Sequence, residues 1–543
     1  MFIVLFLFTT AAAATNWYVR SDGGNASQCT GLADAAYSGS GSGQACAWNH
    51  PFVALPPDGS AARIKGGDTL HIGSGDYMMG RGAPNTGNCY ESGSYECYMT
   101  QIPSGPSPSQ PTRILGAGHD KGCTQAPELW GTERAWMVVN LEGSSNVELS
   151  CLEITDRSSC ILSHCNGGNC EGEVAACKSS GSAPFGDWAT TGISARDSSQ
   201  VVLKDVNIHG LANRGIHAGR ISDWTIERTQ INANGWIGWD GDLAAGEGSS
   251  NSGAISFLES EIGYNGCAER WPGGEIFGCW GQKAGGYGDG LGVGESGGHW
   301  IFEDSTVHHN TSDGIDLLYL NDQGQVTVRR TLVDSNAGNQ IKVSRSALIE
   351  NSVVVGNCSY FRDEGNMLDG DHCRASGDTV YVGLSNNSKT DLVNNTIVSQ
   401  GNCAISGGGG STASQLNLVN NVIIGKDYWL DPSKLSCLYY SGSSEQITWT
   451  RNLISNVRNG ACPGDSRCDT VPGIVSSALD SFDPAPRSTS PLIDAANPVL
   501  APSEDFRRLA RPAGNGPDIG AVEYAAGQHA EEPSDRIFGS RFN

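Results

Sequence analysis

Apolar and polar residues alternate with a period of two in ten eight-residue segments of this chain. Such alternation over so few residues is typical of a β-strand with one buried face, and not of a helix. Most segments begin 21 to 31 residues apart, and the longer steps fit either one unit with an insertion or two units. One short strand cannot bury its apolar face alone, so the repeat predicts a solenoid of stacked units. The segments begin at Val147, Val201, Trp224, Ile255, Trp300, Val326, Ala347, Thr390, Leu416 and Ile447.

Asparagine recurs three residues after the last apolar position of several copies, at Asn234, Asn265, Asn310, Asn336 and Asn357. Asparagine tolerates the left-handed backbone conformation of tight turns. When such residues stack, their side chains can also bond one another in a ladder. A second short strand is expected after the turn, in segments that begin at Arg214, Asp289, Asp313 and Asn339.

A strand, an Asn turn and a second strand every twenty-odd residues resemble the right-handed parallel β-helix of the pectate-lyase superfamily. The resemblance covers roughly residues 147–456. It implies an all-β, right-handed parallel β-helix solenoid that forms a single elongated domain. A β-propeller or another all-β repeat is the alternative, although propeller blades are longer and carry other signatures. This scaffold hosts many functions, so the resemblance fixes architecture better than chemistry.

The ends of the chain differ from the repeats. The apolar run Met1–Phe8 leads into small residues that suit signal-peptide cleavage, and a buried first strand is the alternative. A terminal coil must cover an open core, so atypical ends are expected. No other apolar run approaches the ~18 residues of a membrane span. We therefore expect a signal peptide (1–14), an N-terminal cap with the first coils (15–146), the repeat region (147–456), a C-terminal coil or cap (457–524) and a flexible tail (525–543).

The chain contains 18 cysteines, an even number that predicts up to nine disulfides. Disulfides persist in oxidising compartments, so the protein is expected to be extracellular or periplasmic, with the cell surface as a further option. We expect Cys267–Cys279 to close the base of a long loop. Two local bridges are also expected, Cys89–Cys97 and Cys462–Cys468. A zinc site among the cysteines of residues 151–177 is the alternative, but their spacings match no common zinc motif.

The net charge of −24, with no basic stripe, argues against nucleic acid as a partner. An acidic polysaccharide would be repelled as well, unless a bound cation bridged it to the protein. We expect the protein to be a monomer that binds such a polysaccharide.

Acidic residues recur at the start of the second strands. Equivalent residues of successive coils lie about 4.8 Å apart in a parallel β-helix. Asp289 and Asp313 are one coil apart, as are Asp316 and Lys342, so these four residues should lie within ~10 Å of one another. Asp313 and Asp316 point the same way only if the strand bends between them. Several Asp oxygens suit a hard cation such as Ca²⁺.

The segments GDGLG, SDGIDL and GNQIK, which contain these residues, resemble the calcium-dependent β-helix pectate lyases that use a lysine base. The resemblance implies that Asp289, Asp313 and Asp316 are calcium ligands and that Lys342 is the base. Ser312 departs from the family pattern, which often has a further Asp there, and this puts calcium binding in doubt. The alternative is that the two Asp-Gly sites are turns and that Asp316 and Lys342 form an exposed pair.

Three further residues are candidates for substrate binding. Arg345 could bind a substrate carboxylate through two hydrogen bonds, or be an ordinary surface arginine. Trp236 and Trp239 lie next to two insertions, residues 240–253 and 266–287, and long loops on a rigid solenoid often form a binding cleft. Their rings could stack on sugars or pack within the loops.

These observations predict a secreted, calcium-dependent polysaccharide lyase that cleaves a uronate-containing glycan by β-elimination. A glycoside hydrolase, in which one Asp protonates the leaving oxygen and another activates water, is one alternative. A uronate epimerase would use the same proton abstraction. A non-catalytic carbohydrate-binding or cell-surface adhesion protein is the third alternative, and it would not need Lys342 beside a cation.

Overall fold

The computed structural model describes most of the chain between residues 14 and 525. The described residues are 14–84, 86, 89, 97–162, 177, 186, 188–243, 250–281, 288–363, 367–369, 372–385, 387–441, 445–458 and 462–525. All of the expected signal peptide except Ala14, all of the expected tail except Ala525, and Cys165 and Cys170 lie outside them.

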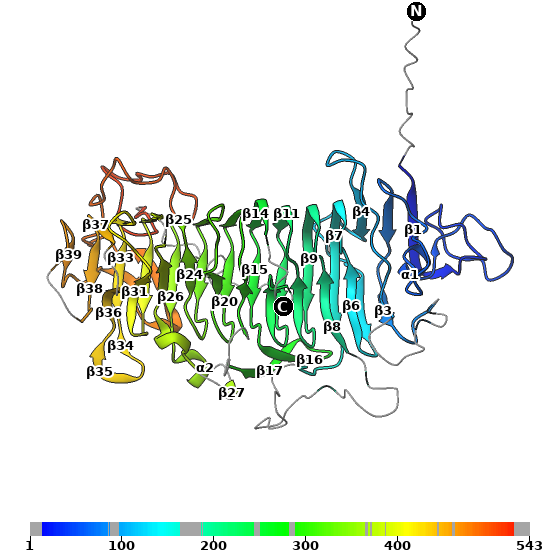
Figure 1. Ribbon diagram of the computed structural model, residues 1–543, viewed down its shortest axis with the longest axis horizontal. Helices are drawn as coiled ribbons and strands as arrows, with labels where there is room; N and C mark the ends of the chain where they lie inside the picture. Colours follow the sequence, from blue (N-terminus) through cyan, green and yellow to red (C-terminus); the bar gives the residue numbers. More distant parts are fainter. Residues whose placement is uncertain are drawn as a thin grey trace, which may run out of the picture.

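The chain winds into an elongated solenoid whose long faces are three parallel sheets (Figure 1). The first sheet contains β1 (Asn16–Gly24), β2 (Thr69–Ile72), β4 (Thr112–Gly116), β7 (Ser145–Asp156), β9 (Ser199–His209), β11 (Ser222–Glu227), β14 (Ser252–Leu258), β19 (His299–Glu303), β22 (Gln325–Arg329), β25 (Ser346–Glu350), β29 (Lys389–Val393), β32 (Gln415–Val419) and β37 (Gln446–Thr450). The long strands β7 and β9 continue into the second sheet.

The second sheet also contains β3 (Asp76–Gly80), β5 (Glu128–Thr132), β12 (Gln230–Asn232), β15 (Glu261–Gly263), β20 (Thr306–His308), β23 (Leu332–Asp334), β26 (Val353–Gly356), β30 (Thr396–Ser399), β33 (Val422–Gly425), β38 (Leu453–Ser455) and β39 (Arg467–Cys468). The third sheet contains β6 (Ala135–Asn140), β8 (Ala189–Ser194), β10 (Arg214–His217), β13 (Ile237–Asp240), β18 (Leu291–Gly292), β21 (Ile315–Leu317), β24 (Ile341–Ser344), β28 (Val380–Gly383), β31 (Cys403–Gly408) and β36 (Cys437–Ser441).

The remaining elements lie in insertions and at the ends. They are β16 (Cys267–Arg270), β17 (Glu275–Trp280), β27 (Met367–Asp369), β34 (Asp427–Tyr428), β35 (Asp431–Leu435), β40 (Ile474–Ser476), β41 (Asp483–Pro486), the short helices α1 (Pro51–Ala54) and α2 (Tyr360–Asp363), and 3₁₀ turns at Arg374–Gly377 and Leu479–Ser481. No helix among the described residues is long and apolar enough to cross a membrane.

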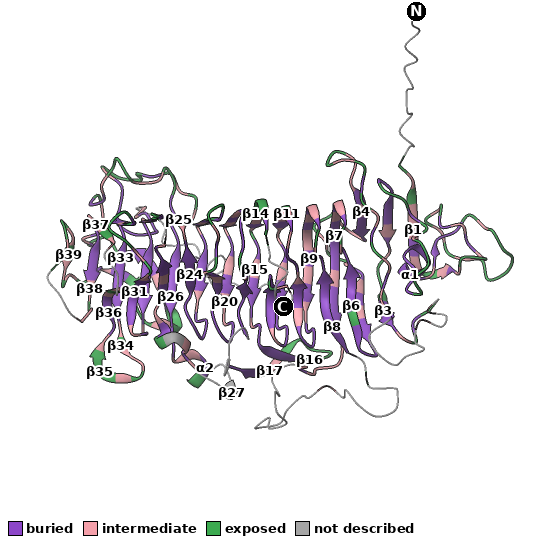
Figure 2. Cartoon of the chain, in the orientation of Figure 1, coloured by how far each residue is buried: buried purple, intermediate pink, exposed green. Residues whose placement is uncertain are grey.

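The parallel β-helix predicted from the repeats is confirmed. All ten sequence copies begin in the first sheet in a single register, from Val147 beside Val201 to Leu416 beside Ile447. The last residues of each copy lie in the second sheet, so the expectation that a copy is one strand holds only for β7 and β9 and is wrong for the other copies, which contain two short strands and the turn between them. Each copy therefore corresponds to one coil, and the long steps are single coils with insertions. Most strand residues are buried, and the exposed residues gather in the loops (Figure 2).

An asparagine ladder stacks at the turn between the second and third sheets. The Nδ2 of Asn234 donates to Oδ1 of Asn265 (3.0 Å), and the bonds Asn265–Asn310 and Asn310–Asn336 follow at 2.8 Å each. The ladder ends at Gln340, which accepts from Asn336, and does not continue to Asn357.

The expectation that these asparagines adopt the left-handed conformation is wrong. That conformation belongs to the residue before each of them, namely Ala233, Tyr264, His309 and Ser335. A second ladder, which the sequence analysis did not identify, joins Asn395, Asn421 and Asn452 at the turn between the first and second sheets.

Aromatic rings fill the interior of the middle coils. Trp239 is fully buried, and its ring packs edge-on against Trp224, Phe257 and Trp300, with centroids 5.4 to 6.1 Å apart. Phe257 in turn stacks on Phe302 at 4.9 Å. Rings this large contribute much of the apolar area that folding removes from water.

The C-terminal segment packs along the side of the solenoid. Its Phe482, Leu492 and Ile519 bury an apolar strip of the second sheet, which includes Val353 and Val422. The segment is held by a buried ion pair between Arg511 and Glu523 (2.7 Å). The C-terminal segment thus covers an apolar strip on the outside of the second sheet, and it does not only continue the chain beyond the last coil.

Eight disulfides join the described cysteines, none of which is free. The predicted pairs Cys267–Cys279, Cys89–Cys97 and Cys462–Cys468 are confirmed. Cys151, Cys160 and Cys177 are all disulfide-bonded, so the zinc alternative loses these three ligands. So many disulfides are typical of a protein that folds in an oxidising compartment.

Candidate functional site

The outer face of the third sheet carries columns of side chains along the solenoid axis. Asp316 pairs with Lys342 on the next coil, and Gly292 precedes Asp316 in the same column. The register expected from the sequence is therefore confirmed between β18, β21 and β24. One coil, β13, lies between β10 and β18, so Asp240 separates His217 from Gly292.

Two carboxylates converge on the side chain of Lys342. Its ammonium nitrogen Nζ lies 3.1 Å from Oδ2 of Asp313 and 2.8 Å from Oδ2 of Asp316. The Lys342 and Asp316 side chains are 15% and 13% exposed, whereas Asp313 is fully buried beneath them. Oδ1 of Asp313 accepts the backbone N–H of Asn339 at 2.6 Å, which fixes this carboxylate in place. The backbone thus brings Asp313 and Asp316 to one point.

Asp289 lies under the same cluster, one coil away. Its Oδ1 accepts the backbone N–H of Asp313 at 2.9 Å, and the residue is buried. Burial, followed by the charges of Asp313 and Asp316, raises the pKa of the Asp289 carboxyl well above its usual value. Asp289 therefore supports the backbone of Asp313.

The electrostatics of the cluster favour a protonated lysine. Burial disfavours the charged form of Lys342, but the carboxylates of Asp313 and Asp316 outweigh it and raise the pKa of the ammonium. Burial and the charge of Asp313 raise the pKa of Asp316 to about 6, while the Lys342 charge opposes that shift. In this arrangement Lys342 is the cation that neutralises the carboxylates, and it cannot accept a proton until it loses its own.

The cluster has the carboxylate oxygens that a calcium site needs, but their arrangement leaves no place for the ion. Two carboxylate oxygens converge on a point suited to a hard cation, but the Lys342 ammonium lies at that point. Across the part of the chain that the structure describes, no three His, Cys, Asp or Glu side chains are grouped so as to hold a metal ion. Calcium binding stays a prediction, and it would require Lys342 to move aside.

Arg345 bonds to the loop that follows β21. Its Nε donates to the carbonyl oxygen of Leu320 at 3.0 Å, and its guanidinium pairs with Asp322 at 3.0 Å. Both partners follow β21, so Arg345 helps to hold the chain beyond Asp316. A role in substrate binding stays a prediction.

The two tryptophans differ in position. Trp236 is half-buried, and the guanidinium of Arg214 lies 4.2 Å from its ring centroid. Trp239 is fully buried in the core, so the prediction that it stacks on a sugar is wrong. Its position in the alternation of β13, one residue before the outward Asp240, carried that information in the sequence.

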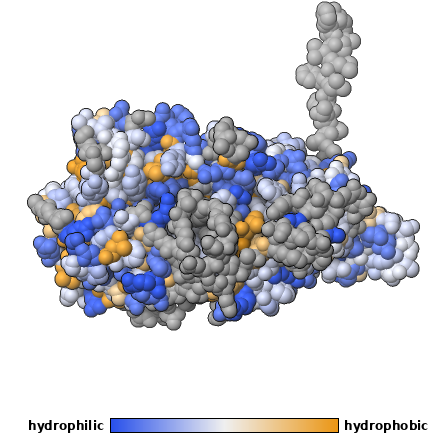
Figure 3. Space-filling view, turned by 60° about the horizontal axis from the view of Figure 1, so that its bottom comes forward, coloured by the Kyte–Doolittle hydropathy of each residue, from blue (hydrophilic) through white to orange (hydrophobic). Residues whose placement is uncertain are grey.

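Insertions bring further groups to the edge of this face. The strands β16, β17 and β27 form a small sheet from two insertions, and the Cys358–Cys373 disulfide closes the second one. Arg374, which follows Cys373, reaches to 3.6 Å from Oδ2 of Asp313. These elements and α2 line the lower edge of the solenoid (Figure 1). The described atoms on that side are mostly hydrophilic, with apolar groups in small patches (Figure 3).

Sequence reasoning missed Arg374 because its contact depends on how a long insertion folds back. It also missed the pair Arg214–Asp240, which lies two coils before Asp316 on the same face.

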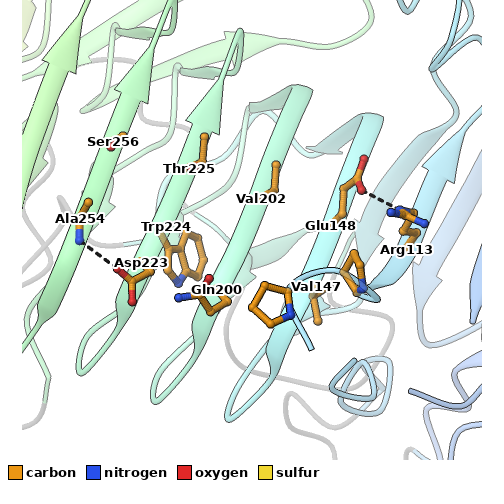
Figure 4. Close-up of a pocket in the computed structure, with 12 residues that line it drawn as sticks. Arg113, Val147, Glu148, Gln200, Val202, Asp223, Trp224, Thr225, Ala254 and Ser256 are labelled. Atoms are coloured by element: carbon orange, nitrogen blue, oxygen red, sulfur yellow. Dashed lines mark hydrogen bonds and ion pairs between the residues drawn. The ribbon is translucent and has the colours of Figure 1, made fainter. Parts of the chain in front are cut away.

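A groove of about 280 Å³ lies elsewhere, on the outer face of the first sheet (Figure 4). Val202 and Thr225 form its floor, and Arg113 pairs with Glu148 at one end (2.9 Å). None of the predicted site residues lines this groove.

Comparisons with known proteins find likeness to solved structures only at low sequence identity. No protein-family model and no curated protein matches the chain. The solved structure of the pectate lyase Pel9A has 13% identity and a TM-score of 0.44, over 94% of this chain and 97% of the other. XylC in complex with xylose has 10% identity and a TM-score of 0.42, over 94% and 98%. The A-module of the Azotobacter vinelandii mannuronan C-5 epimerase AlgE4 has 11% identity and a TM-score of 0.38, over 74% and 90%. The chemistry of this chain therefore has to be argued from its own residues.

Proposed function

We propose that this protein is a secreted enzyme that cleaves a uronate-containing polysaccharide by β-elimination, with Lys342 as the base. The observation that supports the proposal is the convergence of Asp313 and Asp316 on the ammonium of Lys342, at 3.1 and 2.8 Å. Lys342 and Asp316 remain partly exposed, so a glycan on the third sheet can reach both.

The reaction moves one proton and breaks one bond. The base removes the proton on C5 of a uronate, the C4–C5 double bond forms, and the C4–O bond to the preceding sugar breaks. The departing oxygen takes up a proton, so the products are an unsaturated uronide and a shortened glycan. Each uronate residue supplies the acidic C–H and the leaving group, and no oxidant is needed.

Lys342 must lose its proton before it can act in this way. The carboxylates of Asp313 and Asp316 raise the pKa of the ammonium. The neutral amine of Lys342 can therefore form only when another positive charge neutralises these carboxylates. Calcium, when bound to these carboxylates, would supply that neutralisation and offset the charge of the substrate carboxylate. Arg374, 3.6 Å from Asp313, is a second positive charge beside the same oxygen.

A glycoside hydrolase is the second candidate. The pKa of Asp316 is raised to about 6, which suits a carboxyl group that donates a proton to a leaving oxygen near neutral pH. Asp240, two coils away on the same column, is a carboxylate that could activate water. This reaction would not depend on Lys342 as a base.

The test is a screen of polygalacturonate, alginate and glycosaminoglycans with two readouts, ultraviolet absorbance of the unsaturated product and release of reducing ends. Each substrate is incubated with calcium and then with a chelator. Calcium-dependent absorbance supports the lyase. Reducing ends without absorbance favour the hydrolase. A change in uronate configuration without cleavage would indicate an epimerase, and binding without chemistry would indicate an adhesion protein.

A further inference from the structure

The outward column that carries Lys342 continues into aromatic residues. Lys342 pairs with Tyr381 on the next coil, Tyr381 with Ser406, and Ser406 with Tyr440. All four are successive positions on the outer face of the third sheet. We name Tyr381, Ser406 and Tyr440 the tyrosine strip.

The ring of Tyr381 lies along the sheet instead of projecting from it. A Cβ added at Gly408, on the neighbouring strand, would come within 2.6 Å of the Tyr381 hydroxyl oxygen. The absence of a side chain at Gly408 therefore makes room for the hydroxyl end of the ring. Gly407 is likewise close to the hydroxyl of Tyr439, at 2.9 Å from an added Cβ. A ring that lies flat offers its outer face to a ligand.

Tyr440 is 62% exposed, a large fraction for an aromatic side chain on a strand of the solenoid. Ser406, between the two tyrosines, is a small residue, so its own side chain does not separate the two rings. Tyrosine combines an apolar ring with a polar tip, which suits sugars that have an apolar face and a rim of hydroxyls.

We propose that the tyrosine strip binds consecutive sugar residues of a glycan chain that runs along the solenoid axis, on the C-terminal side of Lys342. The proposal rests on the proposed function for placing the reacting sugar at Lys342. A chain laid along the axis passes one coil after another, so it meets Lys342, Tyr381 and Tyr440 in order. The strip would then hold the glycan on one side of the reacting bond.

The test is affinity electrophoresis of full-length protein in gels that contain polygalacturonate, alginate or xylan. All variants carry Lys342→Met, so that a lyase would not degrade the polymer. Tyr381→Ala and Tyr440→Ala should each weaken binding about tenfold, since each removes an aromatic contact without changing net charge. Gly408→Ala should weaken binding in the same direction, because its Cβ displaces the Tyr381 ring. Tyr18→Ala, in a ring stack with His71 on the first sheet, is the matched control and should leave binding unchanged.

Binding to any of these polymers that falls in the strip variants and not in the control supports the proposal, even if the wild-type protein produces no unsaturated product. Failure of the proposed function can therefore be distinguished from failure of this inference. The proposed function is tested by the absorbance of the unsaturated product with wild-type protein, whereas this inference is tested by glycan binding. Equal retardation of the strip variants and the control, or no retardation of any protein, would overturn the inference. Thermal unfolding of each variant identifies a loss of binding that is due to misfolding, and in that case Tyr381→Phe and Tyr440→Phe, which keep the rings, must restore binding.

Discussion

The ammonium nitrogen of Lys342 lies 2.8 Å from Oδ2 of Asp316, a residue 26 positions earlier that pairs directly with it across β21 and β24. The separation equals one coil, so the repeat length itself places the two side chains together. Asp313 shares the same ammonium at 3.1 Å, and its backbone, two residues before β21, is held by Asp289. The charge cluster is thus a product of the coil register.

The asparagine ladder is expected to contribute strongly to stability. Asn310 is fully buried and both accepts from Asn265 and donates to Asn336. Asn310→Ala leaves the backbone N–H and side-chain amide of Asn265 without that acceptor. The free energy of unfolding should fall by about 3 kcal/mol, measured by urea denaturation. Asn16→Ala, at an exposed position, should change it by less than about 0.5 kcal/mol. Equal effects of the two substitutions would contradict the structural role of the ladder.

The buried His209 should make stability depend on pH. Its ring nitrogens lie 2.7 Å from Glu269 and 3.0 Å from Glu153. Burial disfavours the imidazolium, but the hydrogen bonds and charges of both glutamates outweigh it and raise the His209 pKa to about 10. The folded state therefore holds a proton that the unfolded chain releases near pH 6.5, so the stabilisation is complete below that pH and is lost toward pH 10.

His209→Gln should accordingly lower the free energy of unfolding by about 3 kcal/mol at pH 6, and by much less at pH 10. Urea denaturation of both proteins at the two pH values measures this difference. His299→Gln, at a position bonded to Thr327 on the surface of the first sheet, serves as the control. A loss that is the same at pH 6 and pH 10 would show that the imidazolium is not the source of the stabilisation.

Trp239 and Trp236 should respond differently to truncation. Trp239→Ala leaves a cavity among Trp224, Phe257 and Trp300, and should lower the free energy of unfolding by about 3–5 kcal/mol. The affinity of the remaining folded protein for glycan should not change, since the ring cannot be reached from outside. Trp236→Ala, at a half-buried position, should cost about 1 kcal/mol. Weaker glycan binding by folded Trp239→Ala protein would contradict the assignment of this ring to the core.

The fold was predictable because the alternation and spacing of apolar residues encode it directly. All ten copies pair in one register, and the Asn234 to Asn336 ladder follows from residues that recur at the same offset. The same counting of coils placed Asp316 beside Lys342, whereas the convergence of Asp313 on that lysine depended on a bend that the counting left open. The alternation within β13 also placed Trp239 inside, but its position next to an insertion favoured the wrong interpretation.

Other features could not be read from local patterns. Arg374 reaches Asp313 through an insertion whose path depends on a disulfide and on pairing between β17 and β27. The C-terminal segment covers Val353 and Val422 through contacts between residues far apart in the sequence. The second ladder, at Asn395, Asn421 and Asn452, could be identified only after the structure had located the turn between the first and second sheets.

The most direct test of the central claim compares Lys342→Met with Lys389→Met. Lys389 forms an exposed 2.8 Å pair with Asp391 on the first sheet, so the two variants lose the same charge from different faces. The measurement is the rate of unsaturated-uronide absorbance on the best substrate of the screen, with thermal unfolding as a check that both variants fold. Our account predicts that Lys342→Met lowers kcat about 10²–10⁴-fold and that Lys389→Met retains wild-type activity. Folded Lys342→Met protein that turns over at the wild-type rate would contradict the assignment of Lys342 as the base.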